Sequence, residues 1–201
     1  PHDMTEAKKS WFFFEDEYVC LGAGINSRRD LPVATTINQV LMRSDVKVLQ
    51  DNQANTLPHG NREMENVKWV YHDKIGYILP EPAKLNISNQ QEEGRWSDIT
   101  DQKNISEALV TKDVFTLWFD HGERPENATY EYIVVPDVIE HELAVTAANN
   151  REIEILSNTP DLQAVKSNEL NMCQATFYKA GELQIAENFR INLASQGMVM
   201  L

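Results

Sequence analysis

The fold class is decided by the segment Lys8-Lys9-Ser10-Trp11-Phe12-Phe13-Phe14-Glu15-Asp16-Glu17-Tyr18-Val19-Cys20-Leu21-Gly22-Ala23-Gly24-Ile25, which predicts two apolar strands joined by an acidic turn. Side chains of a strand alternate between its two faces, so Trp11 and Phe13 point one way while Phe12 and Phe14 point the other way. Both faces are then apolar. Such a hairpin is typical of the middle of a layered β structure, where aromatic and β-branched residues pack well.

Strand patterns separated by turn residues recur along the rest of the chain. In the first part they are expected at 33–41, 46–49, 67–71, 77–79, 84–88, 114–119 and 130–135. Shorter strands are expected later, at 153–156, 162–166, 172–178, 183–186 and 189–193. The segments 50–65 and 89–107 are interpreted as polar connections without repeats or low complexity.

A single short helix is predicted near residues 137–149, because Pro136-Asp137 offers a start and Ala147-Ala148 favours helix. We therefore expect a mostly β fold of antiparallel strands. A boundary near Asn150 is expected to divide it into a larger β domain, residues 1–150, and a small, truncated C-terminal β domain, residues 151–201.

Composition and charge limit the function. The 201 residues include 24% charged and 42% hydrophobic residues, which are ordinary proportions for a globular protein. No stretch approaches the roughly 20 apolar residues that a membrane helix needs. The net charge is −13, with 18 Lys and Arg against 31 Asp and Glu, and Lys8-Lys9 and Arg28-Arg29 are the adjacent basic pairs. We expect no nucleic-acid partner, because polyanions bind clustered basic residues and this chain has few of them. The lack of a long apolar stretch predicts no membrane span.

The two cysteines, Cys20 and Cys173, lie in strand-like apolar segments. Two buried thiols acting as small hydrophobic side chains are the simpler interpretation. A disulfide between them would close a long loop and stabilise the fold, but the sequence does not show that the two meet. The absence of a C-x-x-C motif and of a His/Cys cluster in the sequence argues against a structural zinc site.

No pattern in the sequence declares an active site. His59, His72, His121 and His141 have no Ser, Cys or second His at the spacing of a triad or metal site, so ordinary surface or turn residues are expected. The turn Glu15-Asp16-Glu17 offers carboxylates that calcium would accept, but it lacks EF-hand spacing, which favours a solvated turn. No cofactor is expected.

Both ends of the chain are unusual. Pro1-His2-Asp3-Met4 does not resemble a natural start, and no signal peptide opens the sequence. The apolar run from Gly197 to Leu201 has no polar tail, although exposed termini are usually polar. Both ends are interpreted as cuts inside a longer protein.

Five segments in order carry a resemblance to a known family: Lys9-Ser10-Trp11-Phe12-Phe13-Phe14, Cys20-Leu21-Gly22-Ala23-Gly24-Ile25, Thr35-Thr36-Ile37-Asn38-Gln39, Gly94-Arg95-Trp96-Ser97-Asp98-Ile99, and Asp120-His121-Gly122 through Tyr130-Glu131-Tyr132-Ile133-Val134-Val135-Pro136. Together they resemble the β-sheet portion of polysaccharide lyase family 8, the chondroitin, hyaluronate and xanthan lyases. The similarity is greatest to a chondroitin sulfate lyase and covers nearly the whole chain. It implies an antiparallel β-sandwich of the super-sandwich type, followed by a small β-sandwich-like domain.

The resemblance also implies an enzyme that cleaves a uronate-containing glycosaminoglycan by β-elimination. In this family the reacting groups are an Asn, a His, a Tyr and an Arg of an upstream helical toroid domain, assisted by a Glu of the sheet domain. None of them can be carried over to a residue of this chain, so it is expected to be the sheet scaffold and inactive alone. The resemblance also implies a secreted or periplasmic parent protein. Whether that parent binds a structural divalent cation is left undecided by the sequence.

Arg28 and Arg29 are the residues that we nominate for contact with the glycan, because they follow the bend at Gly24. Solvated loop arginines without a ligand are the more frequent situation for such residues. A second hypothesis for the whole chain is a non-catalytic carbohydrate-binding or structural β-sandwich module without a lyase parent.

Overall fold

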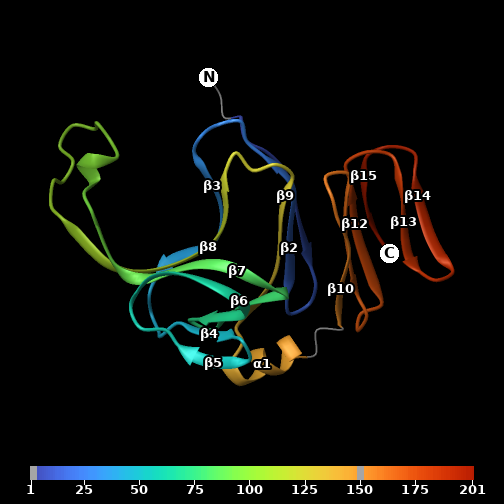
Figure 1. The fold of residues 1–201 in the computed structure, drawn as a ribbon, viewed down its shortest axis with the longest axis horizontal. Coiled ribbons are helices and arrows are strands. Elements are labelled where there is room, and N and C mark those ends of the chain that lie inside the picture. Colours follow the sequence, from blue (N-terminus) through green and yellow to red (C-terminus); the bar gives the residue numbers. More distant parts are fainter. Residues whose placement is uncertain (1–3, 149–151) are drawn as a thin grey trace.

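The computed structural model describes residues 4–148 and 152–201 and consists mostly of β-strands (Figure 1), which confirms the expected fold class. Nine strands form one antiparallel sheet in the order β1-β2-β9-β7-β6-β4-β5, with β8 pairing both β7 and β3. They are β1 (Glu6–Phe13), β2 (Tyr18–Asn26), β3 (Pro32–Leu41), β4 (Lys47–Gln50), β5 (Gln53–Thr56), β6 (Gly60–His72), β7 (Ile75–Gly94), β8 (Val110–Glu123) and β9 (Ala128–Pro136).

The 20-residue strand β7 connects two parts of this sheet. On one side it pairs with β9 along Ile75–Ile78 and then with β8 along Asn86–Gly94. Pro80 and Pro82 lie between these two stretches, and proline has no backbone N–H to donate to a neighbouring strand. Because β7 changes its partner at the prolines, the sheet tolerates them. The two separate strands predicted at 77–79 and 84–88 are therefore corrected to one continuous strand.

The sheet folds over, so that its two parts pack against each other. Cys20 of β2 and Tyr132 of β9 belong to the same buried cluster as Phe115, Leu117 and Phe119 of β8. The rings of Phe119 and Tyr132 lie 6.2 Å apart between their centres. We call this cluster the inner core, and it joins the two ends of β7 through side-chain packing.

The other faces of β2 and β9 are also buried. Val19, Leu21 and Ile133 pack in a second cluster with residues of the helix α1 (Glu140–Ala148) and of the C-terminal strands, which we call the helix-side core. The helix confirms the prediction near 137–149, of which residue 149 lies outside the described residues. Leu143 is its buried residue and contacts the sheet at Gly76. No described helix is long and apolar enough to span a membrane.

The expectation of two dry faces is correct for β2 and wrong for β1. Phe12 is buried, but Trp11 is 52% exposed and Phe13 is 64% exposed. The reason is position, since β1 is the edge strand of the sheet and β2 is its neighbour on the inner side. The Phe13 ring stacks on that of Tyr18 at 5.3 Å, which covers it in part.

The C-terminal part forms a second, smaller layered unit. β10 (Ile153–Asn158), β11 (Leu162–Ser167), β12 (Met172–Phe177) and β15 (Gly197–Met200) make a sheet, and β13 (Gly181–Ala186) and β14 (Phe189–Leu193) make a hairpin. A third core lies between sheet and hairpin and includes Phe177, Leu183 and Ile185. The apolar run at the C-terminus, which was not predicted as a strand, pairs with β12.

Side-chain hydrogen bonds join this smaller unit to β1. The Tyr178 hydroxyl lies 2.9 Å from the Ser10 hydroxyl oxygen, and the Gln174 amide donates to the Phe13 carbonyl at 2.7 Å. Gln163 donates to the Lys8 carbonyl at 3.3 Å. The polar groups along the edge of β1 are thus used in docking. The expected domain boundary near Asn150 lies outside the described residues.

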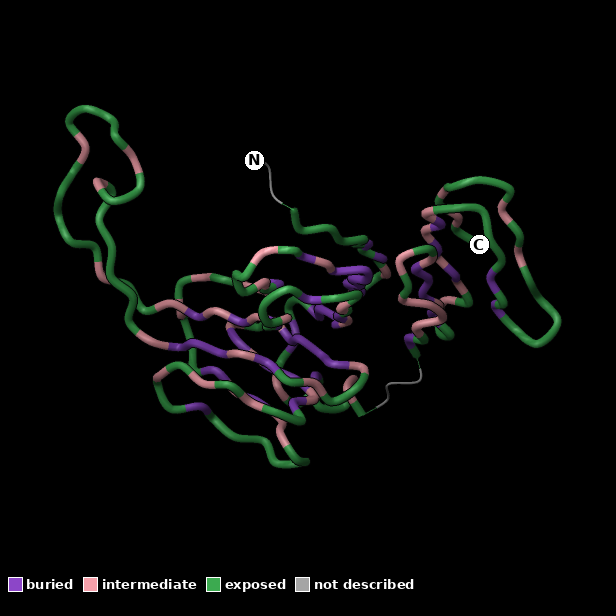
Figure 2. The backbone as a smooth tube through the Cα atoms, turned by 45° about the horizontal axis from the view of Figure 1, so that its top comes forward, coloured by how far each residue is buried: buried purple, intermediate pink, exposed green. Residues whose placement is uncertain are grey.

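The two expected polar connections contain more strand than the sequence indicated. The segment 50–65 includes β5 and the first part of β6, and β7 continues to Gly94 inside the segment 89–107. Between β7 and β8 the chain makes a long excursion with one 3₁₀ turn, Trp96–Asp98. This excursion projects from the sheet and carries mainly exposed and partly exposed residues (Figures 1 and 2). Strands at the edge of a sheet are exposed to solvent and carry polar residues, so their composition does not distinguish them from connecting loops.

The two cysteines are both buried and free. Cys20 belongs to the inner core and Cys173 to the core of the smaller unit, so they are separated and the disulfide alternative is excluded. Burial raises the pKa of the Cys20 thiol to about 11 and also raises the pKa of Cys173. Both thiols therefore act as small apolar side chains.

The close approach of β2 to Tyr130 gives a test of the inner packing. A Cβ atom at Gly22 would lie 2.1 Å from Cε1 of the Tyr130 ring, which is buried and faces Gly22 across the strand pair. We expect Gly22→Ala to lower the free energy of unfolding by about 1–3 kcal/mol, because the ring must shift. Urea unfolding of both the variant and the control Gly94→Ala measures this, since nothing lies within 4 Å of a Cβ at Gly94. Equal midpoints for the two variants would contradict the prediction.

Candidate functional site

The arginine loop, residues 27–31, connects β2 to β3 and carries both nominated residues. Arg28 is exposed, Arg29 is partly exposed, and the Ser27 N–H donates to the Pro125 carbonyl of a neighbouring loop at 3.1 Å. That loop adds a third arginine that the sequence did not single out, Arg124, whose Nε lies 2.5 Å from a carboxylate oxygen of Asp30. The fold thus brings the loops of three arginines together at one end of the sheet, where the Arg124 guanidinium is paired with the Asp30 carboxylate.

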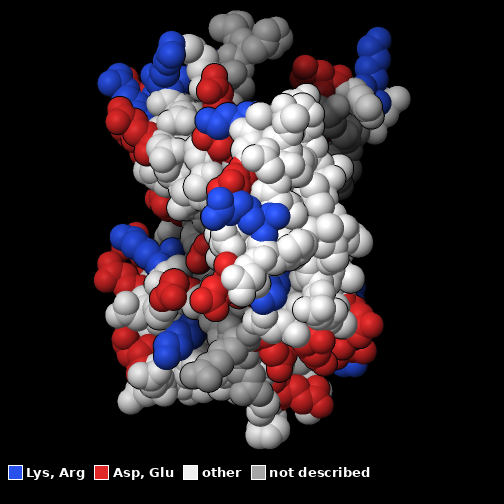
Figure 3. Space-filling model, turned by 90° about the vertical axis from the view of Figure 1, so that its right-hand side faces the viewer, with Lys and Arg blue, Asp and Glu red and all other residues white. Residues whose placement is uncertain are grey.

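One face of the molecule carries side chains of both charges. On the face in Figure 3, Lys and Arg side chains lie among Asp and Glu side chains, and acidic residues gather at one lower corner. This distribution agrees with the net charge of −13 and offers no broad basic face on that side. Electrostatic attraction of a sulfated polymer by this face is therefore weak.

The histidines differ from expectation in one case. His59 and His141 are exposed, but His72 is only 1% exposed, so its prediction as a surface or turn residue is wrong. Its Nε2 accepts a hydrogen bond from the Arg43 N–H at 3.3 Å, and its ring lies 4.6 Å from that of Phe115. Burial lowers the pKa of His72, which keeps it neutral as a packing residue at the end of β6.

A histidine and a tyrosine do meet at one place, which matters because such a pair could transfer protons. The rings of His121 and Tyr130 lie 6.4 Å apart, and His121 Nε2 lies 2.9 Å from the Thr35 hydroxyl. Burial lowers the pKa of His121 and raises that of Tyr130, which is 5% exposed. A buried tyrosine that resists ionisation is a poor base, so this contact serves packing.

Metal binding finds no support in the described part of the chain, where no group of three or more His, Cys, Asp or Glu residues could hold an ion. The acidic turn at Glu15–Glu17 is not such a group. Burial, together with Glu152, Glu169 and Asp16 nearby, raises the pKa of Glu17. The turn is therefore best described as a group of carboxylates that repel one another, and not as a cation site.

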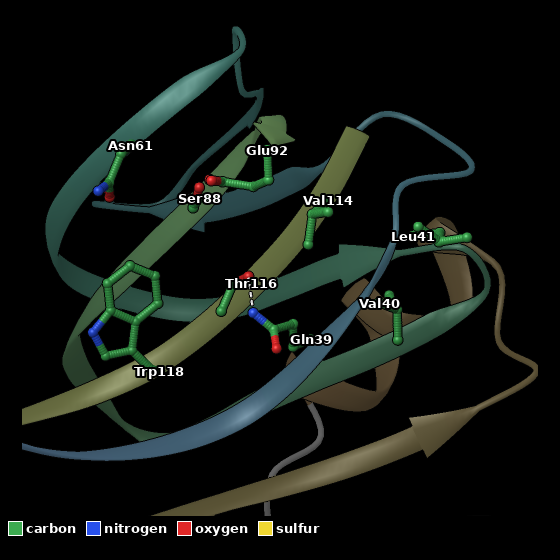
Figure 4. Close-up of a pocket in the computed structure, with 9 residues that line it drawn as sticks. All are labelled: Gln39, Val40, Leu41, Asn61, Ser88, Glu92, Val114, Thr116 and Trp118. Carbon is green, nitrogen blue, oxygen red and sulfur yellow. Dashed lines mark hydrogen bonds between the residues drawn. The ribbon is translucent and has the colours of Figure 1, made fainter. Parts of the chain in front are cut away.

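A groove of about 650 Å³, drawn in Figure 4, is lined mainly by residues of the sheet face that is turned away from the inner core. Four strands, β3, β6, β7 and β8, contribute to it. The polar and aromatic residues that line it are Gln39, Asn61, Ser88, Glu92, Thr116 and Trp118. One end of the groove is aliphatic and is formed by Val40, Leu41 and Val114. The volume is within the range of small-molecule sites, about 300–1,000 Å³.

Strand alternation creates this groove. On β8, Phe115 and Leu117 point into the inner core, so Thr116 and Trp118 point out from the opposite face. In the register, Thr116 faces Ser88 on one side and Gln39 on the other. The Gln39 amide donates to the Thr116 hydroxyl at 3.3 Å, as the dashed line in Figure 4 shows. Polar residues of distant segments thus form one row across three strands.

One polar atom of the groove has no partner. Ser88 is 6% exposed, and its hydroxyl makes no hydrogen bond among the described residues. A buried hydroxyl without a partner costs free energy, so its presence needs a physical explanation. The groove is absent from the sequence predictions because its lining residues lie on four strands that only strand pairing brings together. The alternation of Leu85, Ile87 and Phe115 with polar neighbours indicates one polar face on each of the strands β7 and β8, but not that these strands pair.

Two family models cover almost the whole chain. Residues 2–147 match "Polysaccharide lyase family 8, super-sandwich domain", and residues 154–201 match "Polysaccharide lyase family 8, C-terminal beta-sandwich domain". The chain belongs to polysaccharide lyase family 8. The super-sandwich type that the five quoted segments implied is thereby confirmed, as is the C-terminal β-sandwich.

Characterised relatives of this family 8 chain are lyases of different polymers. It is 41% identical over 185 residues to Chondroitinase-AC of Pedobacter heparinus, covering 92% of the chain and 26% of that relative. It is 32% identical over 183 residues to Xanthan lyase of Bacillus sp. (strain GL1), covering 86% and 20%. The chain therefore spans about a quarter of the length of these relatives or less.

Solved structures of family 8 agree with the fold. A structure of chondroitinase AC lyase from a study of its enzyme-oligosaccharide complexes has a TM-score of 0.89 and 39% identity, covering 100% of this chain and 29% of that one. A Paenibacillus xanthan lyase has a TM-score of 0.86 and 28% identity, covering 98% and 20%. The arrangement of both β units is therefore that of family 8.

Proposed function

We propose that this chain is part of a glycosaminoglycan lyase that cleaves chondroitin sulfate or hyaluronan by β-elimination. The observation that carries the proposal is the 41% identity to Chondroitinase-AC over 92% of the chain. Hyaluronate lyase of Thermasporomyces composti is 30% identical over 180 residues, which supports the same class of substrate. Xanthan lyase, a relative whose name gives a different polymer, has a lower identity than Chondroitinase-AC.

The reaction defines what the whole protein must supply. β-Elimination next to a uronate needs a group that neutralises the carboxylate, a base for the C5 proton, and an acid for the leaving glycosidic oxygen. We propose that these groups lie in an upstream helical domain and that this chain is the β-sheet scaffold, inactive alone. Tyr130 and His121 could otherwise transfer protons in this chain, but Tyr130 is buried, which makes it a poor base and supports this division of roles.

Within the scaffold we propose a large β domain, residues 1–150, and a small one, residues 151–201. The contacts of Tyr178 and Gln174 with β1 would keep the small unit fixed to the sheet. Such a support positions its partner domain by rigidity. We further propose that the parent is secreted or periplasmic, because polymeric substrates are met outside the cytoplasm.

The proposal for Arg28 and Arg29 is contact with the acidic polymer. Guanidinium groups bind sulfate and carboxylate through paired N–H donors, which supports this role for Arg28 and Arg29. The neighbouring Arg124 directs its Nε and Nη2 to the Asp30 carboxylate instead. The competing proposal, a carbohydrate-binding module without a lyase parent, is favoured by the polar groove with its unpartnered Ser88 hydroxyl. An activity assay separates the two proposals.

The assay compares the 201-residue chain with the protein encoded by its complete reading frame. With chondroitin as substrate, the complete protein is expected to produce unsaturated uronate, detected by its ultraviolet absorbance, and the isolated chain to produce none. A complete protein that binds chondroitin without cleaving it would contradict the lyase proposal. Activity of the isolated chain would contradict its role as an inactive scaffold.

Charge reversal in the arginine loop tests the nominated contact. In the complete enzyme, the double variant Arg28→Glu and Arg29→Glu is expected to raise KM for chondroitin sulfate about tenfold with little change in kcat, less so at high salt. Steady-state kinetics measure this. Arg43→Glu is the control for a charge reversal remote from the loop, compared with each single variant Arg28→Glu and Arg29→Glu, because Arg43 is exposed and follows the opposite end of β3. An unchanged KM, or the same rise in the control, would remove these arginines from the substrate site.

A further inference from the structure

We propose that the groove on the outer face of β3, β6, β7 and β8 binds an uncharged sugar unit, a hexose or N-acetylhexosamine of an oligosaccharide. The inference rests on the proposed function, since it gives a polysaccharide lyase a second saccharide site on its scaffold. It also goes beyond that function, because no reacting group is involved. The groove is lined by hydrogen-bonding side chains, an indole and one carboxylate.

The polar groups of the groove are arranged for a ligand with many hydroxyls. Gln39, Thr116 and Ser88 follow one another across three paired strands. Asn61 of β6 continues this row, since it pairs with Ser88 in the register. Amide and hydroxyl groups both donate and accept, which is what sugar hydroxyls and acetamido groups require. Rigid strands hold these side chains better than a loop would.

Besides the row of polar side chains, the Ser88 hydroxyl points to a ligand. It is buried, lines the groove and has no partner among the described residues. The oxygen itself is covered, so a ligand hydroxyl supplies the missing hydrogen bond once the side chains above it turn aside. The desolvation cost of the free hydroxyl would then be offset in the bound state, which favours binding.

Trp118 supplies the apolar part of the site. It is partly exposed at one end of the groove, beyond Thr116, as Figure 4 shows. A pyranose ring has an apolar face of C–H groups, and the negative face of an indole attracts such hydrogens. A flat aromatic surface beside a row of hydrogen-bonding groups therefore matches a sugar ring, which has one apolar face and a polar rim.

The charge of the groove decides which sugar unit it accepts. Glu92 is the one charged residue among the described residues that line it. A carboxylate can accept hydrogen bonds from neutral hydroxyls, but it repels a uronate carboxylate or a sulfate ester. The groove therefore favours the neutral units of a polymer, in contrast to the arginine loop. A peptide segment is a weaker fit, since the polar row and the unpartnered hydroxyl would demand a polar side chain at each position.

The test is a titration of the 201-residue chain with chitotriose, a neutral trimer of N-acetylglucosamine, followed by ¹H–¹⁵N NMR. We expect shifts of the Trp118 indole N–H and of the backbone amides of Ser88 and Thr116. Trp118→Ala is expected to weaken binding about tenfold. Ser88→Ala is expected to weaken it about fivefold to tenfold without lowering the unfolding midpoint, because it removes an unpartnered hydroxyl. That combination separates a ligand contact from a structural role.

Glu92→Gln completes the set of variants. A hyaluronan hexasaccharide is expected to bind more weakly than chitotriose, and Glu92→Gln to reduce the difference, because the repulsive charge is gone. Chitotriose shifts that are absent, or that lie away from the groove, would overturn the proposal. So would slow hydrogen exchange of the Trp118 indole in the complete protein without sugar, since a protein segment would then fill the groove.

The experiments distinguish failure of the groove proposal from failure of the lyase proposal. Binding in the groove with no unsaturated product from the complete protein would leave the saccharide site and remove the lyase function. Unsaturated product without binding in the groove would leave the lyase function and remove the second site. The two failures are therefore distinguishable in one preparation of each protein.

Discussion

The change of partner along β7 is the constraint on which the rest of the structure depends. One edge of this strand pairs first with β9 and then with β8, and the two prolines that lack N–H donors lie where neither ladder is needed. The first part of β7 thereby belongs to one half of the sheet, with β9, and its last part to the other half, with β8. β2 and β9 can then fold against β8, and the inner core fills the space between them.

This folding determines which faces are dry and which remain for function. β2 and β9 lie between the inner core and the helix-side core, so both of their faces are apolar. β8 and the end of β7 have one core and one open face, and the open face holds the groove (Figure 4). The arginine loop lies at a strand end. A scaffold role and a saccharide site are thus compatible, because they use opposite faces of the same strands.

The sequence predicted the fold class and most strands, because alternation and turn residues are local signals. It failed where the neighbour in space decides: Trp11 and Phe13 are exposed because β1 is an edge, and β7 passes through Pro80 because its partner changes there. The short strands β5 and β15 were missed for the same reason. Arg28 and Arg29 were nominated from local charge, and their contact with the polymer stays a prediction. The groove unites residues up to 79 positions apart, such as Gln39 and Trp118, which only pairing can reveal.

Hydrogen exchange along β7 tests most directly whether this strand holds the sheet together. Ile78 pairs with β9 and Ile87 with β8, and both are buried. If β7 joins both parts into one cooperative unit, amides on both sides of the prolines should exchange with the same free energy, equal to that of global unfolding. A clearly lower value on one side would contradict this account, because that part of the sheet would then open independently of the other.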